Sequence, residues 1–163
     1  MGQDQEHQDD SMVMIETNLD DMSGEWMGYV MDRLFETGAK DAFYTPIYMK
    51  KNRPAQKLSV LAKEQDLATI LDLLFKETTT LGVRYYPVTC HRLERQFLKV
   101  RLPLGEVSVK VGRRDGVVVQ IAPEYEECAM IARNSGIPLK QVFNQVQQAF
   151  RNQYPEWEVN KKA

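Results

Sequence analysis

Two stretches with helical spacing of apolar residues, each flanked by strand-like segments, limit what this chain can fold into. Residues 25–37 and 66–77 each place apolar side chains on one helical face, at spacings of three and four residues. Segments rich in β-branched and aromatic residues surround them. The predicted strands lie near residues 12–15, 41–49, 57–63 and 83–90. This strand-helix-strand-strand-helix-strand order is typical of the ferredoxin-like βαββαβ fold, in which both helices cover one sheet face.

The pattern changes after residue 94, where three short strand-like segments follow one another and two helical segments come after them. Turn signals at 103–105 and 113–116 separate the short strands. The predicted fold class is therefore α+β, with a ferredoxin-like βαββαβ unit followed by a β-meander and C-terminal helices. We expect these segments: 1–12 a disordered linker, 13–90 the ferredoxin-like unit, 91–155 the meander with two helices, 156–163 a tail.

Composition narrows the function classes. The net charge of −2 argues against a general nucleic-acid partner, so any anion site must be a local cluster. No apolar run approaches the ~20 residues of a membrane span, and no signal peptide is visible, which predicts a cytoplasmic protein with no membrane partner. Cys90 and Cys128 lack metal-ligand spacing and are expected to be free thiols. With only two histidines, a permanent His-rich metal site is not expected.

The segment 77–86 combines three hydroxyl residues, a glycine and an arginine between a predicted helix and a predicted strand. Thr78, Thr79 and Thr80 weaken the helix end, and Gly82 can adopt a positive φ and stop it. Hydroxyls and backbone N–H groups beside Arg84 suit a phosphate or a carboxylate. An ordinary helix end followed by a strand explains the same residues.

A compact basic loop, Lys50-Lys-Asn-Arg-Pro54, lies between two predicted strands. Lys50, Lys51 and Arg53 supply the concentrated positive charge that a triphosphate requires, and an arginine can bind phosphate through two parallel hydrogen bonds. A solvated loop is the alternative. Pro46, inside the preceding strand, predicts an edge position or a bulge.

Four oxygen donors occur between residues 16 and 21, namely Glu16, Asn18, Asp20 and Asp21. Carboxylates at a strand end are the ligands that Mg²⁺ or Mn²⁺ prefers, and Asp20 and Asp21 are the first candidates. Helix capping by Asp21 or Ser23 is an equally simple explanation.

The meander is the most basic part of the chain, and strand alternation places some of its cations on one face. A solvated sheet face is one interpretation. RNA binding is another, but the net negative charge and the lack of an RNP-like aromatic motif count against it. We find no nucleophile set supported by spacing, so no catalytic residue is identified.

Four blocks of this sequence stand out together: Glu16-Thr-Asn-Leu-Asp-Asp-Met22, Phe43-Tyr-Thr-Pro-Ile-Tyr-Met-Lys-Lys-Asn-Arg-Pro54, Glu77-Thr-Thr-Thr-Leu-Gly-Val-Arg-Tyr-Tyr86 and Ile121-Ala-Pro-Glu-Tyr-Glu-Glu-Cys128. Together they resemble the C-terminal domain of the LarC family, the nickel-insertion proteins for the nickel-pincer nucleotide cofactor used by lactate racemase. The resemblance spans roughly residues 13–150.

The resemblance implies a CTP-dependent nickel chelatase, or cyclometallase, of the lyase class. Such proteins insert Ni²⁺ into a pyridinium bis-thiocarboxylate mononucleotide while CTP is cleaved to CMP and pyrophosphate, with Mg²⁺ or Mn²⁺ assisting. It also implies a homo-oligomer, a trimer or a hexamer. The family's N-terminal domain and His-rich stretch have no counterpart here, so we expect this chain to be the C-terminal half and the N-terminal domain to be its partner.

The chemistry of these residues and the resemblance together assign residues to the nucleotide and to the metal. We expect Lys50, Lys51, Arg53, Thr78, Thr79, Thr80 and Arg84 to bind CTP, and Asp20 and Asp21 to bind the divalent metal. The alternative is a non-catalytic ferredoxin-like module that binds a small anion or forms oligomers. The density of charged and hydroxyl residues in the connections favours the first hypothesis.

Overall fold

The computed structural model describes residues 5–157. The backbone forms two units, Gln8–Cys90 and a second made of residues 5–7 and 91–157. Each unit has its own sheet and its own hydrophobic core, so each is described by itself. The coarse fold prediction is confirmed, because the chain is a mixed α and β protein with two antiparallel sheets and C-terminal helices.

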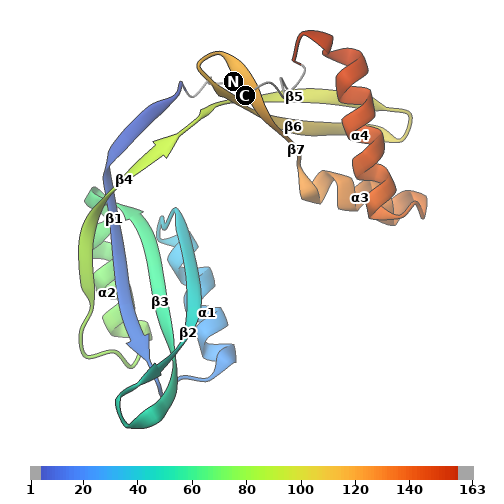
Figure 1. Ribbon diagram of the computed structural model, residues 1–163. Coiled ribbons are helices and arrows are strands. Elements are labelled where there is room, and N and C mark those ends of the chain that lie inside the picture. The colour runs from blue at the N-terminus through green and yellow to red at the C-terminus, as the bar shows by residue number, and fades with distance from the viewer. Residues whose placement is uncertain (1–4, 158–163) are drawn as a thin grey trace. The chain divides into compact units, whose positions relative to one another are not determined.

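The first unit contains a four-stranded sheet with strand order β2-β3-β1-β4. Helices α1 and α2 lie against one face of this sheet (Figure 1). Pro46 lies on β2, an edge strand, as expected for a residue without an N–H group to donate to a neighbouring strand. The elements are β1 (His7–Leu19), α1 (Gly24–Glu36), β2 (Asp41–Met49), β3 (Arg53–Lys63), α2 (Leu67–Glu77) and β4 (Arg84–Arg92).

Strand alternation divides β1 between the helix-covered face and the open face of the sheet. Ile15 and Leu19 are buried in the core, and Thr17 between them is only 1% exposed. Glu16 and Asn18 point to the opposite face, where Glu16 lies across from Ser59 and Asn18 across from Lys57 on β3. Glu16 and Asn18 therefore share the sheet face that the helices leave open.

The structure corrects two local expectations. Residues 7–12, expected to be part of a disordered linker, belong to strand β1, which begins at His7; backbone pairing uses N–H and C=O groups that polar residues also carry. Residues 1–4 lie outside the described part of the chain, as do 158–163 of the expected tail. Gly82 does not end α2, which stops at Glu77 because Thr78 is already extended, with φ −126° and ψ 170°.

The second unit contains a three-stranded sheet in the order β5-β6-β7, followed by two helices. Helix α4 lies across one face of this sheet (Figure 1), and its buried residues Val142, Val146 and Phe150 join the second core. None of the helices in the described part of the chain has the length and apolar character that a membrane span requires. The elements are β5 (Glu94–Leu102), β6 (Gly105–Arg114), β7 (Val117–Pro123), α3 (Tyr125–Ser135) and α4 (Leu139–Gln153).

Where β7 ends, a carboxylate of helix α3 accepts hydrogen bonds from a residue of β6. Glu127 on α3 accepts hydrogen bonds from the backbone N–H and the hydroxyl of Ser108, and Lys99 lies 3.6 Å from it. Burial alone raises the pKa of Glu127, but the Ser108 donors and Lys99 outweigh it and lower that pKa below its ordinary value. The ionised carboxylate is therefore the form that stabilises the folded unit.

Replacing Glu127 with glutamine is expected to cost about 1 kcal/mol of unfolding free energy at pH 7, because the amide keeps an acceptor for Ser108 but loses the charge. Because the pKa of Glu127 is lower in the folded than in the unfolded chain, its carboxylate stabilises the fold fully at pH values above its unfolded pKa of about 4.3. This stabilisation disappears as the pH falls through the pKa of the folded chain. Denaturant titrations at pH 7 and pH 3 measure the difference. An equal cost at both pH values would show that the charge contributes nothing.

Candidate functional site

The predicted metal ligand Asp20 follows the end of β1 and contacts the predicted basic loop. Arg53, the first residue of β3, donates from Nη1 to Asp20 Oδ2 at 3.1 Å. The loop itself is the turn Lys50–Asn52 between β2 and β3. Lys51 and Asn52 both adopt positive φ, 62° and 59°, a conformation that residues other than glycine rarely adopt. The turn thus holds Lys51 in a strained conformation two residues before Arg53, which contacts Asp20.

The second predicted metal ligand, Asp21, contacts the hydroxyl segment instead. Thr79 donates its hydroxyl hydrogen to Asp21 Oδ1. The hydroxyls of Thr80 and Thr17 lie 2.5 Å apart, and both reach the carbonyl oxygen of Gly82. The adjacent carboxylates of Asp20 and Asp21 therefore join two connections that the sequence separates, the β2–β3 turn and the α2–β4 loop.

The three threonines have different environments. Thr78 is buried and donates its hydroxyl hydrogen to the carbonyl oxygen of Leu74 at 2.6 Å, which satisfies the end of α2. Its oxygen also accepts from the backbone N–H of Thr80 at 3.2 Å. Thr79 is the member of the segment that touches a predicted metal ligand.

Arg84, at the start of β4, lies with Glu16 and Asn18 on the open face. Its Nε donates to Glu16 Oε2 at 3.0 Å, and its Nη2 donates to Asn18 Oδ1 at 3.2 Å. Lys57 on β3 donates to the other oxygen of Glu16 at 2.8 Å. The hydrogen bond from Lys57, followed by that from Arg84, lowers the pKa of Glu16 in spite of its burial.

Lys57 was not among the residues expected to bind CTP. The available signal was the alternation of Glu16 and Asn18, which puts both side chains on one face of β1. The partner strand β3 then had to supply residues to that face, but the register that places Lys57 opposite Asn18 follows from the folded sheet.

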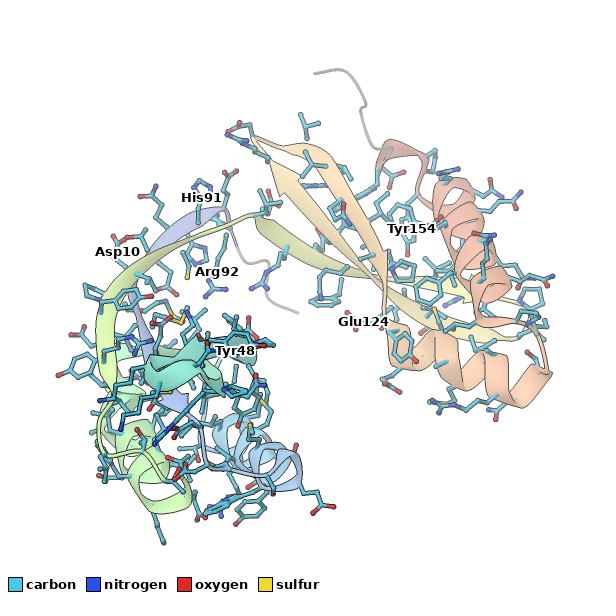
Figure 2. The ribbon with its side chains drawn as sticks, turned by 60° about the horizontal axis from the view of Figure 1, so that its bottom comes forward. Asp10, Tyr48, His91, Arg92, Glu124 and Tyr154 are labelled. Atoms are coloured by element: carbon cyan, nitrogen blue, oxygen red, sulfur yellow. The ribbon has the colours of Figure 1, made fainter. Side chains whose placement is uncertain are left out.

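A small hollow of about 260 Å³ adjoins Asp20. Asp20 and Gln56 contribute the polar groups of its lining, and methionines, prolines and Tyr48 make most of the rest. Tyr48 projects from the β2–β3 hairpin (Figure 2) and is 78% exposed. The hollow offers an apolar surface beside Asp20.

Several cations of the meander contact carboxylates inside the second unit. Lys110 lies 3.4 Å from Glu124, the residue that precedes α3 (Figure 2), and also 5.5 Å from the centre of the Phe97 ring. Arg113 lies 3.6 Å from Glu94. In these contacts, cations of the meander are engaged by carboxylates of the same unit.

The two cysteines are free thiols, as expected. Cys128 is buried, and burial, with smaller contributions from Glu127 and Glu124, raises the pKa of its thiol. A protonated thiol is a poor metal ligand. Among residues 5–157, no group of three or more His, Cys, Asp or Glu side chains converges in the manner of a preformed metal site.

Comparison with known proteins identifies the family to which this chain belongs. The family model described as nickel insertion protein matches residues 1–143. A pyridinium-3,5-bisthiocarboxylic acid mononucleotide nickel insertion protein of Thermotoga petrophila is 49% identical over 134 residues, covering 82% of this chain and 34% of the relative. Its counterpart from Lactiplantibacillus plantarum is 46% identical over 134 residues, covering 82% and 32%. The chain thus spans about a third of these curated relatives' length.

Solved structures agree with this placement. The structure of LarC2, the C-terminal domain of a cyclometallase involved in the synthesis of the NPN cofactor of lactate racemase, is 44% identical with a TM-score of 0.81, and the match covers 87% of this chain and 96% of LarC2. A protein of Methanopyrus kandleri is 26% identical with a TM-score of 0.68, covering 96% and 95%. The chain belongs to the nickel insertion protein family and corresponds to the C-terminal domain of its LarC members.

Proposed function

We propose that this chain is the CTP- and metal-binding part of a nickel chelatase. The whole protein would insert Ni²⁺ into pyridinium bis-thiocarboxylate mononucleotide and cleave CTP to CMP and pyrophosphate. One observation carries the proposal: the neighbouring carboxylates of Asp20 and Asp21 contact Arg53 and Thr79, which belong to the two connections with phosphate-binding chemistry. Family membership and the likeness to LarC2 support the same function.

The residues present fit a Mg²⁺ or Mn²⁺ ion that arrives with the nucleotide. Mg²⁺ in nucleotide sites is typically held by one or two carboxylates together with substrate phosphates. Asp20 and Asp21 supply two carboxylates, and no third acidic, His or Cys ligand converges with them in residues 5–157. When bound, the ion would neutralise negative charge on the triphosphate.

The other residues of the site would position the triphosphate. Lys50, Lys51, Arg53 and Arg84 supply cationic donors for phosphate oxygens, and Thr79 and Thr80 supply hydroxyls. Thr78, whose hydroxyl is bonded to Leu74, would act through the backbone conformation of the segment. Phosphoryl-type cleavage relies mainly on positioning and on charge neutralisation, which fits a site without an evident nucleophile.

Nickel is the cargo of the reaction. The pincer precursor brings soft sulfur donors of its own, which suits a chain whose buried Cys128 remains protonated. We propose that the remaining two thirds of the family's length, including the N-terminal domain, contribute to nickel handling, and that the protein assembles as a homo-oligomer, a trimer or a hexamer.

A non-catalytic role is the second candidate. The strand order β2-β3-β1-β4 with two helices on one face supports a ferredoxin-like assignment for residues 8–90, and such sheets also serve as oligomerisation surfaces. Phe43 and Tyr86, both 44% exposed, alternate onto the open face and favour this candidate. The two candidates differ in whether the chain recognises a nucleotide.

Calorimetric titration with CTP, ATP, GTP and UTP, each with and without Mn²⁺, separates them. Metal-dependent binding of CTP in preference to the other nucleotides is the expected result. Absence of CTP binding by a folded chain would reject the nucleotide-binding proposal and leave the non-catalytic module.

Replacing Lys51 with glycine is expected to weaken CTP binding by about 1–3 kcal/mol, or about 5- to 150-fold, the scale of a charge-assisted contact. Glycine accepts the φ of 62° without strain, so the substitution removes the cation and preserves the turn. Titration of the variant with CTP and Mn²⁺ measures the change.

Asn52→Gly is the matched control for Lys51→Gly. It relieves the same kind of strain, at a φ of 59°, but changes no charge, so its CTP affinity should equal that of the wild type. Unchanged affinity in Lys51→Gly would remove Lys51 from the site. A loss in Asn52→Gly equal to that in Lys51→Gly would assign the effect to turn conformation.

A further inference from the structure

A carboxylate on the open sheet face of the first unit holds two cations that come from different strands. The Glu16 side chain is 12% exposed and accepts hydrogen bonds from Lys57 on β3 at 2.8 Å and from Arg84 on β4 at 3.0 Å. The Ser59 hydroxyl lies 3.5 Å from the same carboxylate. Glu16 therefore connects the two strands that flank β1.

The cluster carries an excess of positive charge. Two cations share one carboxylate, and both are more exposed than it is, at 29% for Lys57 and 51% for Arg84. An ammonium group has three donors and a guanidinium has five. The hydrogen bonds to Glu16 and Asn18 use one donor of Lys57 and two of Arg84. The remaining donors suit an incoming anion.

The long side chains of lysine and arginine lose rotamer freedom when they bind a ligand, and this loss weakens binding. A half-buried carboxylate that already fixes both reduces the loss. Because the hydrogen bond from Lys57, followed by that from Arg84, lowers the pKa of Glu16, the carboxylate stays ionised at neutral pH and keeps both cations in place.

The strand that carries Glu16 leads to the Asp20–Arg53 pair. Glu16 and Asn18 alternate along the same face of β1, and Asp20 directly follows the end of this strand at Leu19. The chain from Glu16 to Asp20 covers at most about 13 Å when it is extended. Asn18, in the middle, accepts from Arg84. A triphosphate held at Asp20 spans part of this distance, and the long side chains of Lys57 and Arg84 reach across the rest.

We infer that Lys57 is a further triphosphate-binding residue, and that Glu16 is a positioning residue that holds Lys57 and Arg84 for the phosphates farthest from Asp20. The inference rests on the proposed function, since it assigns two more residues to the same site. Under this inference Glu16 is not a metal ligand, although the sequence places it among the oxygen donors of residues 16–21.

The test is calorimetric titration of the full chain with CTP and with CMP, in Mn²⁺. Lys57→Met is expected to weaken CTP binding by about tenfold and to leave CMP binding within about twofold, because CMP lacks the outer phosphates. Lys63→Met is the matched control: it removes the same charge from an exposed position of the same strand and face, and it should bind CTP as the wild type does.

The direction in which Glu16→Gln changes the CTP affinity separates a positioning role from a simple charge effect. Removal of a negative charge from an anion site should strengthen binding if charge alone matters. If Glu16 positions the cations, CTP binding weakens by severalfold, and Lys57→Met costs much less in the Glu16→Gln background than alone. Stronger CTP binding in Glu16→Gln, or a lowered melting temperature with unchanged affinity, would overturn the positioning role.

The outcomes separate this inference from the proposed function. CTP binding by the wild type with normal affinity in Lys57→Met overturns the inference and leaves the proposed function intact. A wild type that does not bind CTP overturns both. Should Glu16→Gln fail to fold, Lys57→Met, at a partly exposed position, still decides the assignment of Lys57.

Discussion

Replacing Asp20 with asparagine is expected to remove the metal dependence of CTP binding and to weaken binding in saturating Mn²⁺ by about 100-fold. Asparagine has nearly the same shape and keeps an oxygen that accepts from Arg53, which lies 3.1 Å from Asp20. The change therefore removes a metal ligand while the basic turn keeps its anchor. Binding through the cations alone should persist, so titrations in Mn²⁺ and in EDTA should give the same weak affinity.

Asp10→Asn is the control for this experiment. Asp10 is an exposed carboxylate on β1, the strand that Asp20 follows (Figure 2), so its neutralisation changes the net charge equally. Its CTP affinity and metal dependence should match the wild type. Full metal dependence in Asp20→Asn would show that Asp20 serves only to fix Arg53, and Asp21 with its Thr79 contact would then be the remaining candidate ligand.

The parts of the fold that sequence reasoning predicted are those with local causes. The apolar spacing of 25–37 and 66–77 gave two amphipathic helices, and Pro46 marked an edge strand because of its missing N–H group. The helix end at Glu77 was also signalled locally by β-branched threonines, although the stop was attributed to Gly82. Here the extended backbone of Thr78 and its bond to Leu74 end the helix first.

The arrangement of the candidate site has no such local cause. Arg84 and Glu16 are 68 residues apart in sequence, and Thr79 and Asp21 are 58 apart. Their contacts depend on strand order and register, which place β1 between β3 and β4. Residue type identified the phosphate-binding candidates, whereas only the folded sheet shows that Lys57 shares a carboxylate with Arg84.

The nine residues first assigned to CTP and metal, and Glu16 and Lys57 added to them, all lie within the first unit, Gln8–Cys90. Disruption of the second core is therefore expected to leave CTP binding intact. Phe150→Ala empties the place of a side chain that is 1% exposed and lies in that core, and should destabilise residues 91–157 by about 3–5 kcal/mol. CTP affinity should stay within about twofold, the scatter expected of a distant site.

Leu58→Ala is the counterpart in the first core. Leu58 is fully buried on β3 beside Lys57, and its truncation should cost about 2–5 kcal/mol and reduce CTP binding as the sheet loses its folded population. Thermal unfolding of both variants, followed by titration with CTP below the first transition, makes the comparison. Loss of CTP binding in Phe150→Ala while residues 8–90 remain folded would mean that the second unit contributes directly to nucleotide recognition. The assignment of the site to the open face of the first sheet would then have to be extended.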